Sequence, residues 1–273
     1  MSLFSTEFDG YKHKVIKIFG IKFKKKLSGK ELAKIHAKKG NQFILHKENG
    51  DIEEFPEIPG LKVQFYGTNC KVELWEPVNF KQHKTSQSSW HLYGDNNSIE
   101  IKSSKHAINN LFIDSLGNIF GLSTHNNKIF IDEDFSCEEI AFHFLFTNNC
   151  TVKIGKNCMF SSKITLFTGD GHTLYNLDNP QNVNTTNFGI TIGNHVWIGH
   201  DVKILKDVII PDNTVIGTSS LVNKQFSKPN TVIAGIPAKV VKENISWDRR
   251  RVEEYLADIN KKSEEETKET AAK

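Results

Sequence analysis

The chain has 273 residues, of which 38% are hydrophobic and 25% charged, and this composition excludes wholesale disorder. Its formal net charge of +3 is too small to indicate a protein that binds nucleic acid. No apolar run approaches the roughly 20 residues that span a bilayer, and the N-terminus lacks the apolar core of a signal peptide. We therefore expect a mostly β protein of the cytoplasm. The widely spaced cysteines form no CxxC pair and suit reduced thiols: Cys70, Cys137, Cys150 and Cys158.

The first segment, residues 1–59, is basic. Residues 11–39 carry many lysines and few acids, and Ser28-Gly-Lys-Glu31 predicts a capping box for a short helix that ends near Gly40. This helix and a hairpin could cover the first turn of the fold that follows. Alternatively, the segment could make a weak contact with the anionic inner face of a membrane.

A loose repeat follows. YGTNCKVEL (66–74) and YGDNNSIEI (93–101) are near copies, and HNNKIFI (125–131) and TNNCTVKI (147–154) have the same pattern. Each places an Asn-rich turn before alternating apolar residues, and Asn tolerates left-handed turn conformations. The pattern predicts irregular turns of a solenoid with long insertions such as 75–91.

A strict repeat of six begins at Ile192 and reads IGNHVW, IGHDVK, ILKDVI, IPDNTV and IGTSSL. The period of a helix is 3.6 and that of a strand is 2, so neither explains it. A period of six predicts a short strand and a turn on each of three sides, with glycines such as Gly193, Gly199 and Gly217 at the corners. The fold class is therefore an all-β solenoid, a parallel β-helix. The residues expected to stack inside it are Ile192, Ile198, Ile204, Ile210, Ile216 and Val222.

Ile154, Phe160 and Leu166 already keep the step of six, and an extruded loop, 168–190, interrupts the register between Leu166 and Ile192. The loop contains Gly169-Asp170-Gly171-His172. A loop this long that leaves a rigid coil is more often functional than decorative. After the coil, residues 246–273 combine strong helix formers with dense charge. They predict a C-terminal helix that covers the last turn or packs on a neighbouring subunit, followed by a frayed tail.

The loop histidine, followed by IGNHVWIG, IGTSSLV and AGIPAKVV, resembles the sugar O-acetyltransferases of the left-handed hexapeptide-repeat family. The spelling GDGH and the trailing KENISWDR are similar to bacterial capsule and polysialic acid O-acetyltransferases. The resemblance covers about 145–250 and implies a left-handed β-helix over 60–245. It also implies a homotrimer with active sites between subunits, acetyl-CoA as the acyl donor and no metal.

The resemblance further implies direct transfer of the acetyl group to a sugar hydroxyl of a bacterial surface glycan or its precursor, such as sialic acid, polysialic acid or capsule. His172 matches the general base of the family, and a positioned base contributes ~10²–10⁴-fold to such a step. Asp170 is expected to orient the imidazole or to contact the acceptor. Trp197 is expected to flank the thioester or the acceptor.

The donor site is also implied by the resemblance. His200 stands where the family has a small residue, and lysines are common phosphate ligands. The pantetheine groove is matched by His200, Thr218 and Ser219. The residues that follow the repeat are matched by Asn223 and Lys224, and the contacts with the CoA phosphates by Lys239 and Lys242.

Three other interpretations stay open. An amino-sugar N-acetyltransferase would share the donor, but such enzymes often carry an N-terminal nucleotide-sugar domain, for which residues 1–59 are too short and too basic. His195 and His200 resemble the His-x4-His pair of β-helix carbonic anhydrases, which need a third zinc ligand. The third interpretation is a hexapeptide scaffold without catalytic activity.

Overall fold

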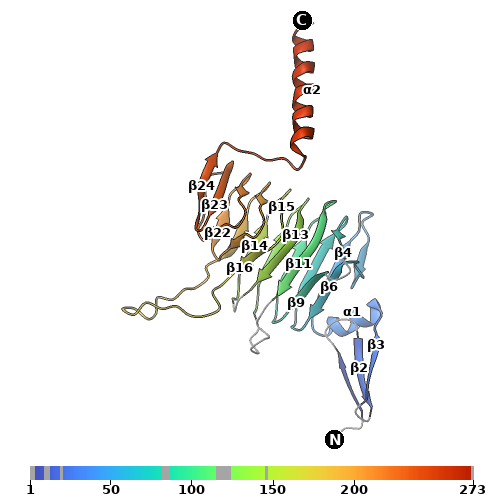
Figure 1. The fold of residues 1–273 in the computed structure, drawn as a ribbon. Helices are drawn as coiled ribbons and strands as arrows, with labels where there is room; N and C mark the ends of the chain where they lie inside the picture. Colours follow the sequence, from blue (N-terminus) through green and yellow to red (C-terminus); the bar gives the residue numbers. More distant parts are fainter. Residues whose placement is uncertain are drawn as a thin grey trace.

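The computed structural model describes residues 4–8, 13–18, 21–81, 87–114, 124–144 and 147–271. Most of them form a coil of parallel strands in which each turn pairs with the next (Figure 1). In the regular part, paired residues lie three repeats of six apart, as in Ile190 with Val208 and Trp197 with Val215. The period of six therefore sets the register of the coil, as predicted.

The coil has three faces. The first face contains β4 (Gln42–His46), β7 (Lys71–Trp75), β10 (Ser98–Ile101), β12 (Lys128–Ile131), β14 (Thr151–Ile154), β17 (Gly189–Ile192) and β20 (Val208–Ile210). The second contains β8 (Asn79–Phe80), the first parts of β11 (Ala107–Asp114) and β13 (Ser136–His143), β15 (Met159–Phe160), β18 (Trp197–Ile198), β21 (Val215–Ile216) and β23 (Thr231–Gly235). The third contains β6 (Leu61–Phe65), β9 (Ser88–Leu92), the last parts of β11 and β13, β16 (Ile164–Phe167), β19 (Lys203–Ile204) and β22 (Leu221–Val222).

Three corners separate these faces. In the turn that starts with β17, the first corner is 193–196, the second corner is 199–202 and the third corner, which returns to the first face, is 205–207. The same names are used for the equivalent positions of other turns. One residue at each corner adopts the left-handed conformation, with φ of +54° at His195 and Asp201 and +57° at Asp207. The corner glycines have a different role from the one expected of them. A Cβ on Gly193 would lie 2.7 Å from the backbone nitrogen of Asp212 on the next turn, so the close stacking of the turns requires glycine there.

The core is the column of aliphatic residues that the repeat predicts. All six expected positions from Ile192 to Val222 are at most 1% exposed, which confirms the prediction. The small or β-branched residues four places after the first five of them are also buried, so these positions are filled from inside. Burying one such aliphatic side chain contributes about 1.5–3 kcal/mol, which makes the stack the main stabilising element of the coil.

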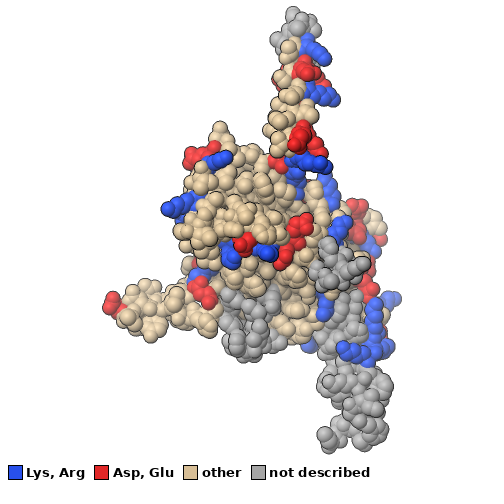
Figure 2. Space-filling view, in the orientation of Figure 1, with Lys and Arg blue, Asp and Glu red and all other residues tan. Residues whose placement is uncertain are grey.

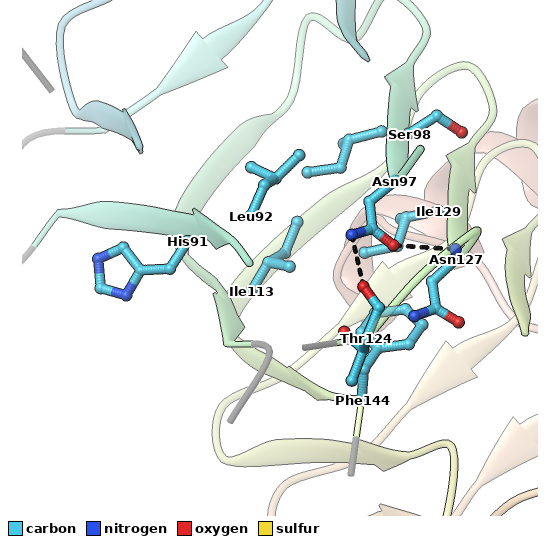
Figure 3. A pocket seen from close by; sticks show the side chains of 10 residues that line it. His91, Leu92, Asn97, Ser98, Ile113, Thr124, Asn127, Ile129 and Phe144 are labelled. Atoms are coloured by element: carbon cyan, nitrogen blue, oxygen red, sulfur yellow. Dashed lines mark hydrogen bonds between the residues drawn. The ribbon is translucent and has the colours of Figure 1, made fainter. Parts of the chain in front are cut away.

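Asparagine shapes the irregular turns. The asparagines in the four loose repeats take positive φ at the third corner, as the sequence predicts: Asn69, Asn96, Asn126 and Asn149. The next residue points inward. Figure 3 shows that the Asn97 side chain donates to the Thr124 carbonyl oxygen (2.8 Å) and accepts from the Asn127 backbone (2.9 Å). The cavity beside it measures about 20 Å³, the size of a single water molecule, so this polar group serves the fold.

Cysteine takes the inward position in two of these turns. Cys70 and Cys150 follow Asn69 and Asn149, where Asn97 and Asn127 stand in the turns between them. All four cysteines of the chain lie among the described residues, are buried and form no disulfide in this structure. Burial raises the pKa of the Cys70 thiol to about 11, so this group stays protonated at neutral pH.

The coil begins earlier than the expected boundary at residue 60. β4 pairs in parallel with β7, Phe43 opposite Val72 and Leu45 opposite Leu74, and therefore forms part of the first face. β5 (Ile52–Glu54) pairs antiparallel with β4 at the edge. The reason is the same asparagine device, because the Asn41 side chain donates to the Gly67 carbonyl oxygen and accepts from the Cys70 backbone. The turn that contains β4 lacks the Tyr-Gly that begins two of the loose repeats, so comparison of the repeats in the sequence did not find it.

The helix of the basic segment packs on the start of the coil. It contains an antiparallel sheet of β1 (Phe4–Phe8), β2 (His13–Ile18) and β3 (Ile21–Lys26), followed by α1 (Gly29–Ala37). The predicted capping box between Ser28 and Glu31 is present. His36 is 2% exposed and stacks on Phe55, with ring centroids 5.1 Å apart, so α1 packs on the first turn.

His36 predicts a pH dependence of stability. Burial, with a smaller contribution from Lys39, lowers the pKa of its imidazole from 6.5 to about 4. The unfolded chain therefore binds this proton more readily, and the stabilisation by neutral His36 is complete above about pH 6.5 and is lost as the pH falls towards 4. We expect about 2–3 kcal/mol of the unfolding free energy to disappear across this interval. Denaturant titrations at several pH values check this, and His36→Leu should flatten the dependence. Equal pH dependence in both proteins would contradict the prediction.

The C-terminal region leaves the coil after a short segment without helix or strand, 244–251, which we call the C-terminal strap. β24 (Ala238–Glu243) pairs antiparallel with β23, and the Trp247 indole then donates to the His195 carbonyl oxygen at the first corner (2.8 Å). α2 (Val252–Ala271) projects away from the coil in Figure 1 and does not cover its last turn. The helix persists to Ala271, and the rest of the expected frayed tail, 272–273, lies outside the described residues. Neither α1 nor α2 is both long and apolar enough to cross a bilayer.

Candidate active site

The loop expected at 168–190 is present at the third corner. It leaves after β16 and returns at β17, so that residues 168–188 lie outside the strands (Figure 1). A bridge between Tyr175 and Val183 closes its outer part into a hairpin. Leu174 and Leu177 on this hairpin are 69% and 86% exposed. Figure 2 shows the hairpin as largely uncharged, and Asp178 is the only acidic or basic residue between positions 171 and 188, His172 aside.

A hollow of about 410 Å³ lies where this loop joins the coil. His172 lines it with an exposed side chain, and no described residue forms a hydrogen bond with the imidazole. The other lining residues carry mostly hydroxyl and amide groups, which suit a polar, hydroxyl-bearing ligand. They are Thr147, Asn148, Asp170, Gly171, Thr173, Val183, Asn184, Thr185 and Thr186.

Asp170 is held by two side chains other than the histidine. Its Oδ2 accepts hydrogen bonds from Lys206 Nζ and Asn184 Nδ2, each at 2.6 Å. Burial opposes ionisation of this carboxyl, but the hydrogen bonds from Lys206 and Asn184 outweigh it and lower its pKa. Among the described residues it makes no hydrogen bond with the His172 imidazole. The geometry therefore offers no direct contact by which Asp170 would orient the ring.

Trp197 lies on a different side of the coil. It belongs to β18 on the second face, is 39% exposed, and has its ring 6.2 Å from that of Trp247 in the C-terminal strap. The His172 loop leaves from the third corner, between the third and first faces. A single chain therefore does not bring Trp197 and His172 together.

The expected pantetheine groove follows the second corner. His200 and Thr218 occupy equivalent positions of successive turns, and the Ser219 backbone donates to the His200 carbonyl oxygen (2.8 Å). Thr218 and Ser219 are exposed. The His200 ring contacts Ser162 Oγ on the preceding turn (2.8 Å), which turns the imidazole away from Thr218. The larger side chain at position 200 therefore leaves the Thr218 part of the corner open.

The expected phosphate ligands are separated along β24. Lys239 pairs with Ala234, which lies against Gly217 at the second corner, so Lys239 is close to that corner. Lys242 pairs with Val232 at the other end of β24, nearer to the first corner. Both lysines are exposed.

Asn223 and Lys224 occupy another corner. They follow β22 and lie at the third corner, one turn beyond Lys206 and Asp207. The expected donor residues are thus divided, with these two on the side of the loop and the other five along the second corner and β24.

The coil matches a known repeat family. Residues 189–224 match the family "Bacterial transferase hexapeptide (six repeats)". This stretch is a bacterial transferase hexapeptide repeat. The chain is similar to the galactoside O-acetyltransferase of Escherichia coli (strain K12), 37% identical over 120 residues that are 44% of this chain and 56% of that protein. It is also similar to the polysialic acid O-acetyltransferase of Neisseria meningitidis, 44% identical over 107 residues, 39% of this chain and 49% of that protein. The chain spans about half the length of these curated relatives.

A solved structure extends the likeness beyond the hexapeptide repeat. The polysialic acid-specific acetyltransferase NeuO superposes with a TM-score of 0.59 at 28% identity, over 78% of this chain and 80% of that one. The superposition takes in most of the coil, including irregular turns that the family match does not reach. The expected left-handed parallel β-helix is thereby confirmed.

The hexapeptide repeat also separates the two histidines of the zinc interpretation. His195 lies at the first corner, where its ring stacks on Trp247 at 4.3 Å, and His200 lies at the second. His195 Nδ1 contacts Asn213 Oδ1 at 2.9 Å. The part of the chain that the structure describes contains no cluster of three His, Cys, Asp or Glu side chains suited to a metal ion.

Sequence reasoning missed Asn184, Lys206 and Asp207. Asp207 Oδ1 accepts hydrogen bonds from the backbones of Asn187, Phe188 and Gly189 at 2.9–3.2 Å, where the loop returns to the coil. The available signal was positional. Lys206 and Asp207 form the charged pair in ILKDVI at the third corner of the turn that follows the insertion, and these are the side chains next to the roots of the loop.

Proposed function

We propose that this protein is an O-acetyltransferase that moves an acetyl group from acetyl-CoA to a sugar hydroxyl of a bacterial surface glycan or its precursor. The observation that carries the proposal is the exposed imidazole of His172 in a hydroxyl- and amide-lined hollow at the root of a loop from a hexapeptide-repeat coil. Two sequence relatives of this coil are named as sugar O-acetyltransferases, one for galactosides and one for polysialic acid. Sialic acid, polysialic acid and other capsule sugars are the first acceptors to test.

His172 is the general base in this mechanism. It accepts the proton of the acceptor hydroxyl while the hydroxyl oxygen attacks the thioester carbonyl carbon. The tetrahedral intermediate then collapses, the bond from carbon to sulfur breaks, and the thiolate that leaves takes up the proton. A neutral imidazole suits this task near neutral pH, and the exposed side chain is accessible to an acceptor that enters the hollow.

The donor lies along the second corner in this proposal. Thr218 and Ser219 present short exposed side chains there. The hydrogen bond to Ser162 directs the His200 ring towards the preceding turn and away from Thr218. Lys239 stands at the end of this groove and meets the phosphates together with Lys242, while Asn223 and Lys224 contribute from the third corner. Trp197 on the second face borders the thioester.

Two copies of the chain complete one site. His172 leaves from the third corner, whereas the donor groove follows the second, so the loop of one copy must reach the groove of another. The exposed side chains of Leu174, Tyr175 and Leu177 support this arrangement, because burying them against a neighbour removes apolar surface from water. A homotrimer supplies three equivalent clefts and leaves no loop without a groove.

The reaction takes place in the cytoplasm under this proposal, since four buried thiols without a disulfide are typical of a reducing compartment. Lys30 and Lys34 in α1 and Lys38 at its C-cap follow one another at intervals of four and are exposed. They support a weak contact of the basic segment with an anionic membrane surface at its inner face.

Replacing Lys239 and Lys242 with alanine should raise the KM for acetyl-CoA and leave kcat close to that of the wild type. Both side chains are exposed, and removing two positive charges weakens binding of the phosphates in the ground state and in the transition state alike. Initial rates over a range of acetyl-CoA concentrations measure the effect. Lys128→Ala, an exposed lysine on β12 of the first face, is the matched control. An unchanged KM in the double variant would remove both lysines from the donor site.

The proposed activity is tested by incubating the purified chain with acetyl-CoA and a panel of glycans while the released thiol is recorded. Mass spectrometry of the product should show the mass of one added acetyl group. Mild alkali separates the alternatives, because it removes an O-acetyl ester and leaves the amide of an amino-sugar N-acetyltransferase intact. Absence of turnover on every glycan, together with absence of CoA binding, would favour the scaffold without catalytic activity.

A further inference from the structure

We propose that Lys206 is a positioning residue that fixes His172 over the hollow, and that Asp170 serves as its anchor on the loop. The inference rests on the proposed function for the role of His172. We call the contacts of Lys206 and Asp207 with the loop the clamp, and these contacts are seen in the structure whatever the role of His172. It assigns Asp170 a role in holding the loop in place of the two roles expected from the sequence, which were orienting the imidazole and contacting the acceptor.

Lys206 joins the two roots of the loop. Its Nζ donates to Asp170 Oδ2 on the outgoing root at 2.6 Å. It also donates to the carbonyl oxygens of Asn184 and Thr185 on the returning root, at 2.6 Å and 3.2 Å. An ammonium group has three protons, and all three are used here. Lys206 therefore has no donor left for a ligand in the hollow, and its positive charge is paired with Asp170 on the loop.

Asn184 carries the constraint on to His172. Its Nδ2 donates both to Asp170 Oδ2, at 2.6 Å, and to the carbonyl oxygen of His172, at 3.0 Å. Its Oδ1 accepts from the backbone of Leu174 at 2.8 Å. A continuous set of hydrogen bonds thus runs from the coil through Lys206, Asp170 and Asn184 to the backbone on both sides of Thr173.

Asp207 completes the clamp with the opposite charge. Its carboxylate accepts hydrogen bonds from the backbone amides of 187–189. At this corner Lys206 therefore binds backbone carbonyl oxygens of the loop, and the adjacent Asp207 binds its backbone amides. Burial opposes ionisation of this carboxyl, but the backbone hydrogen bonds outweigh it and lower its pKa. The side chains of Lys206 and Asp170 are 19% and 39% exposed, so solvent screens this ion pair in part.

The outer part of the loop has few contacts that would hold His172 in place. The loop is largely exposed, and the bridge between Tyr175 and Val183 ties the hairpin only to itself. A catalytic side chain that moves by about 1 Å can lose about 100-fold in rate. Lys206 therefore contributes to catalysis through the geometry of His172, although it touches no reacting atom.

Lys206→Met tests the proposal, because methionine keeps the apolar stem and removes the three donors. Asn184→Ala is a second variant, and its residue lies on the loop, outside the strands of the coil. Lys156→Met is the control: Lys156 also forms an ion pair, 2.8 Å from Glu133, but at the exposed first corner. Two quantities are measured for each protein, the amide hydrogen exchange of peptides covering 170–186 and the separate values of kcat and KM for acetyl-CoA.

We expect exchange in 170–186 to accelerate about tenfold or more in Lys206→Met and Asn184→Ala, with unchanged exchange in the coil. We expect kcat to fall by about 10- to 100-fold while the KM for acetyl-CoA stays within about twofold. The control should match the wild type in both measurements. Wild-type exchange, or faster exchange with an unchanged kcat, would overturn the positioning role. Exchange is measured without substrate, so a failure of the clamp is distinguishable from a failure of the proposed acetyl transfer.

Discussion

Replacing His172 with alanine should lower kcat by two or more orders of magnitude and leave the affinity for acetyl-CoA nearly unchanged. The expected loss is that of a positioned general base, ~10²–10⁴-fold. We expect the binding of the donor to survive, because the residues proposed to hold it, Thr218, Ser219 and Lys239, are unchanged in this variant. Steady-state rates and a direct measurement of CoA binding on the same preparation check both parts.

The matched control for this variant is His106→Ala. His106 is partly buried beside the first corner, on the other side of the coil from the loop. Its replacement should leave kcat close to that of the wild type. Turnover at the wild-type rate in His172→Ala would end the assignment of the base, and a large loss of CoA affinity would place the histidine in the donor site instead.

Mixing two inactive variants restores activity if two copies build each site. His172→Ala removes the base from the loop, and Thr218→Trp fills the exposed second corner where the donor is proposed to lie. Each variant alone should lose most of its activity. After unfolding and refolding together, a loop with an intact histidine meets an intact groove in about a quarter of the clefts of a randomly mixed trimer. The rate measured in the mixture, compared with that of each variant alone, is the test.

A double variant carrying both changes on one chain is the control for this experiment. Mixed with His172→Ala chains, it cannot form a complete cleft, because neither partner supplies the base. Rates in the first mixture that equal the average of its two components would contradict a site shared between chains. Light scattering on the wild type reports independently whether the chain forms a trimer.

The repeat of six determined the regular part of the coil without any tertiary information. Whether a side chain points inward depends on its place within its own hexapeptide, so the inward position of Ile204 or Ile216 is decided by neighbours in sequence. The asparagine turns at Asn96 and Asn126 are local in the same way, since the left-handed conformation is a property of one residue. The capping box of Ser28 and Glu31 spans three positions and was equally predictable.

The first turn of the coil and the course of α2 were decided by packing. β4 joins the first face because Phe43 and Leu45 continue the apolar column below Val72 and Leu74, and no motif marks that continuation in the sequence. The C-terminal helix does not cover the last turn: the Trp247 indole binds the His195 carbonyl oxygen and holds the preceding segment on the first corner, and α2 then projects away from the coil (Figure 1).

The candidate site was predictable only in part. The sequence by itself determined the coil, the position of the loop within it and the presence of a histidine suited to act as a base. The tertiary structure alone decided which corner each residue occupies, and hence that His172 and Trp197 lie apart and that Lys206 binds Asp170 across the inserted loop. The physical reason is that corners are assigned by counting turns around the coil. An insertion leaves the repeat intact on both sides, yet brings together side chains that no local pattern relates.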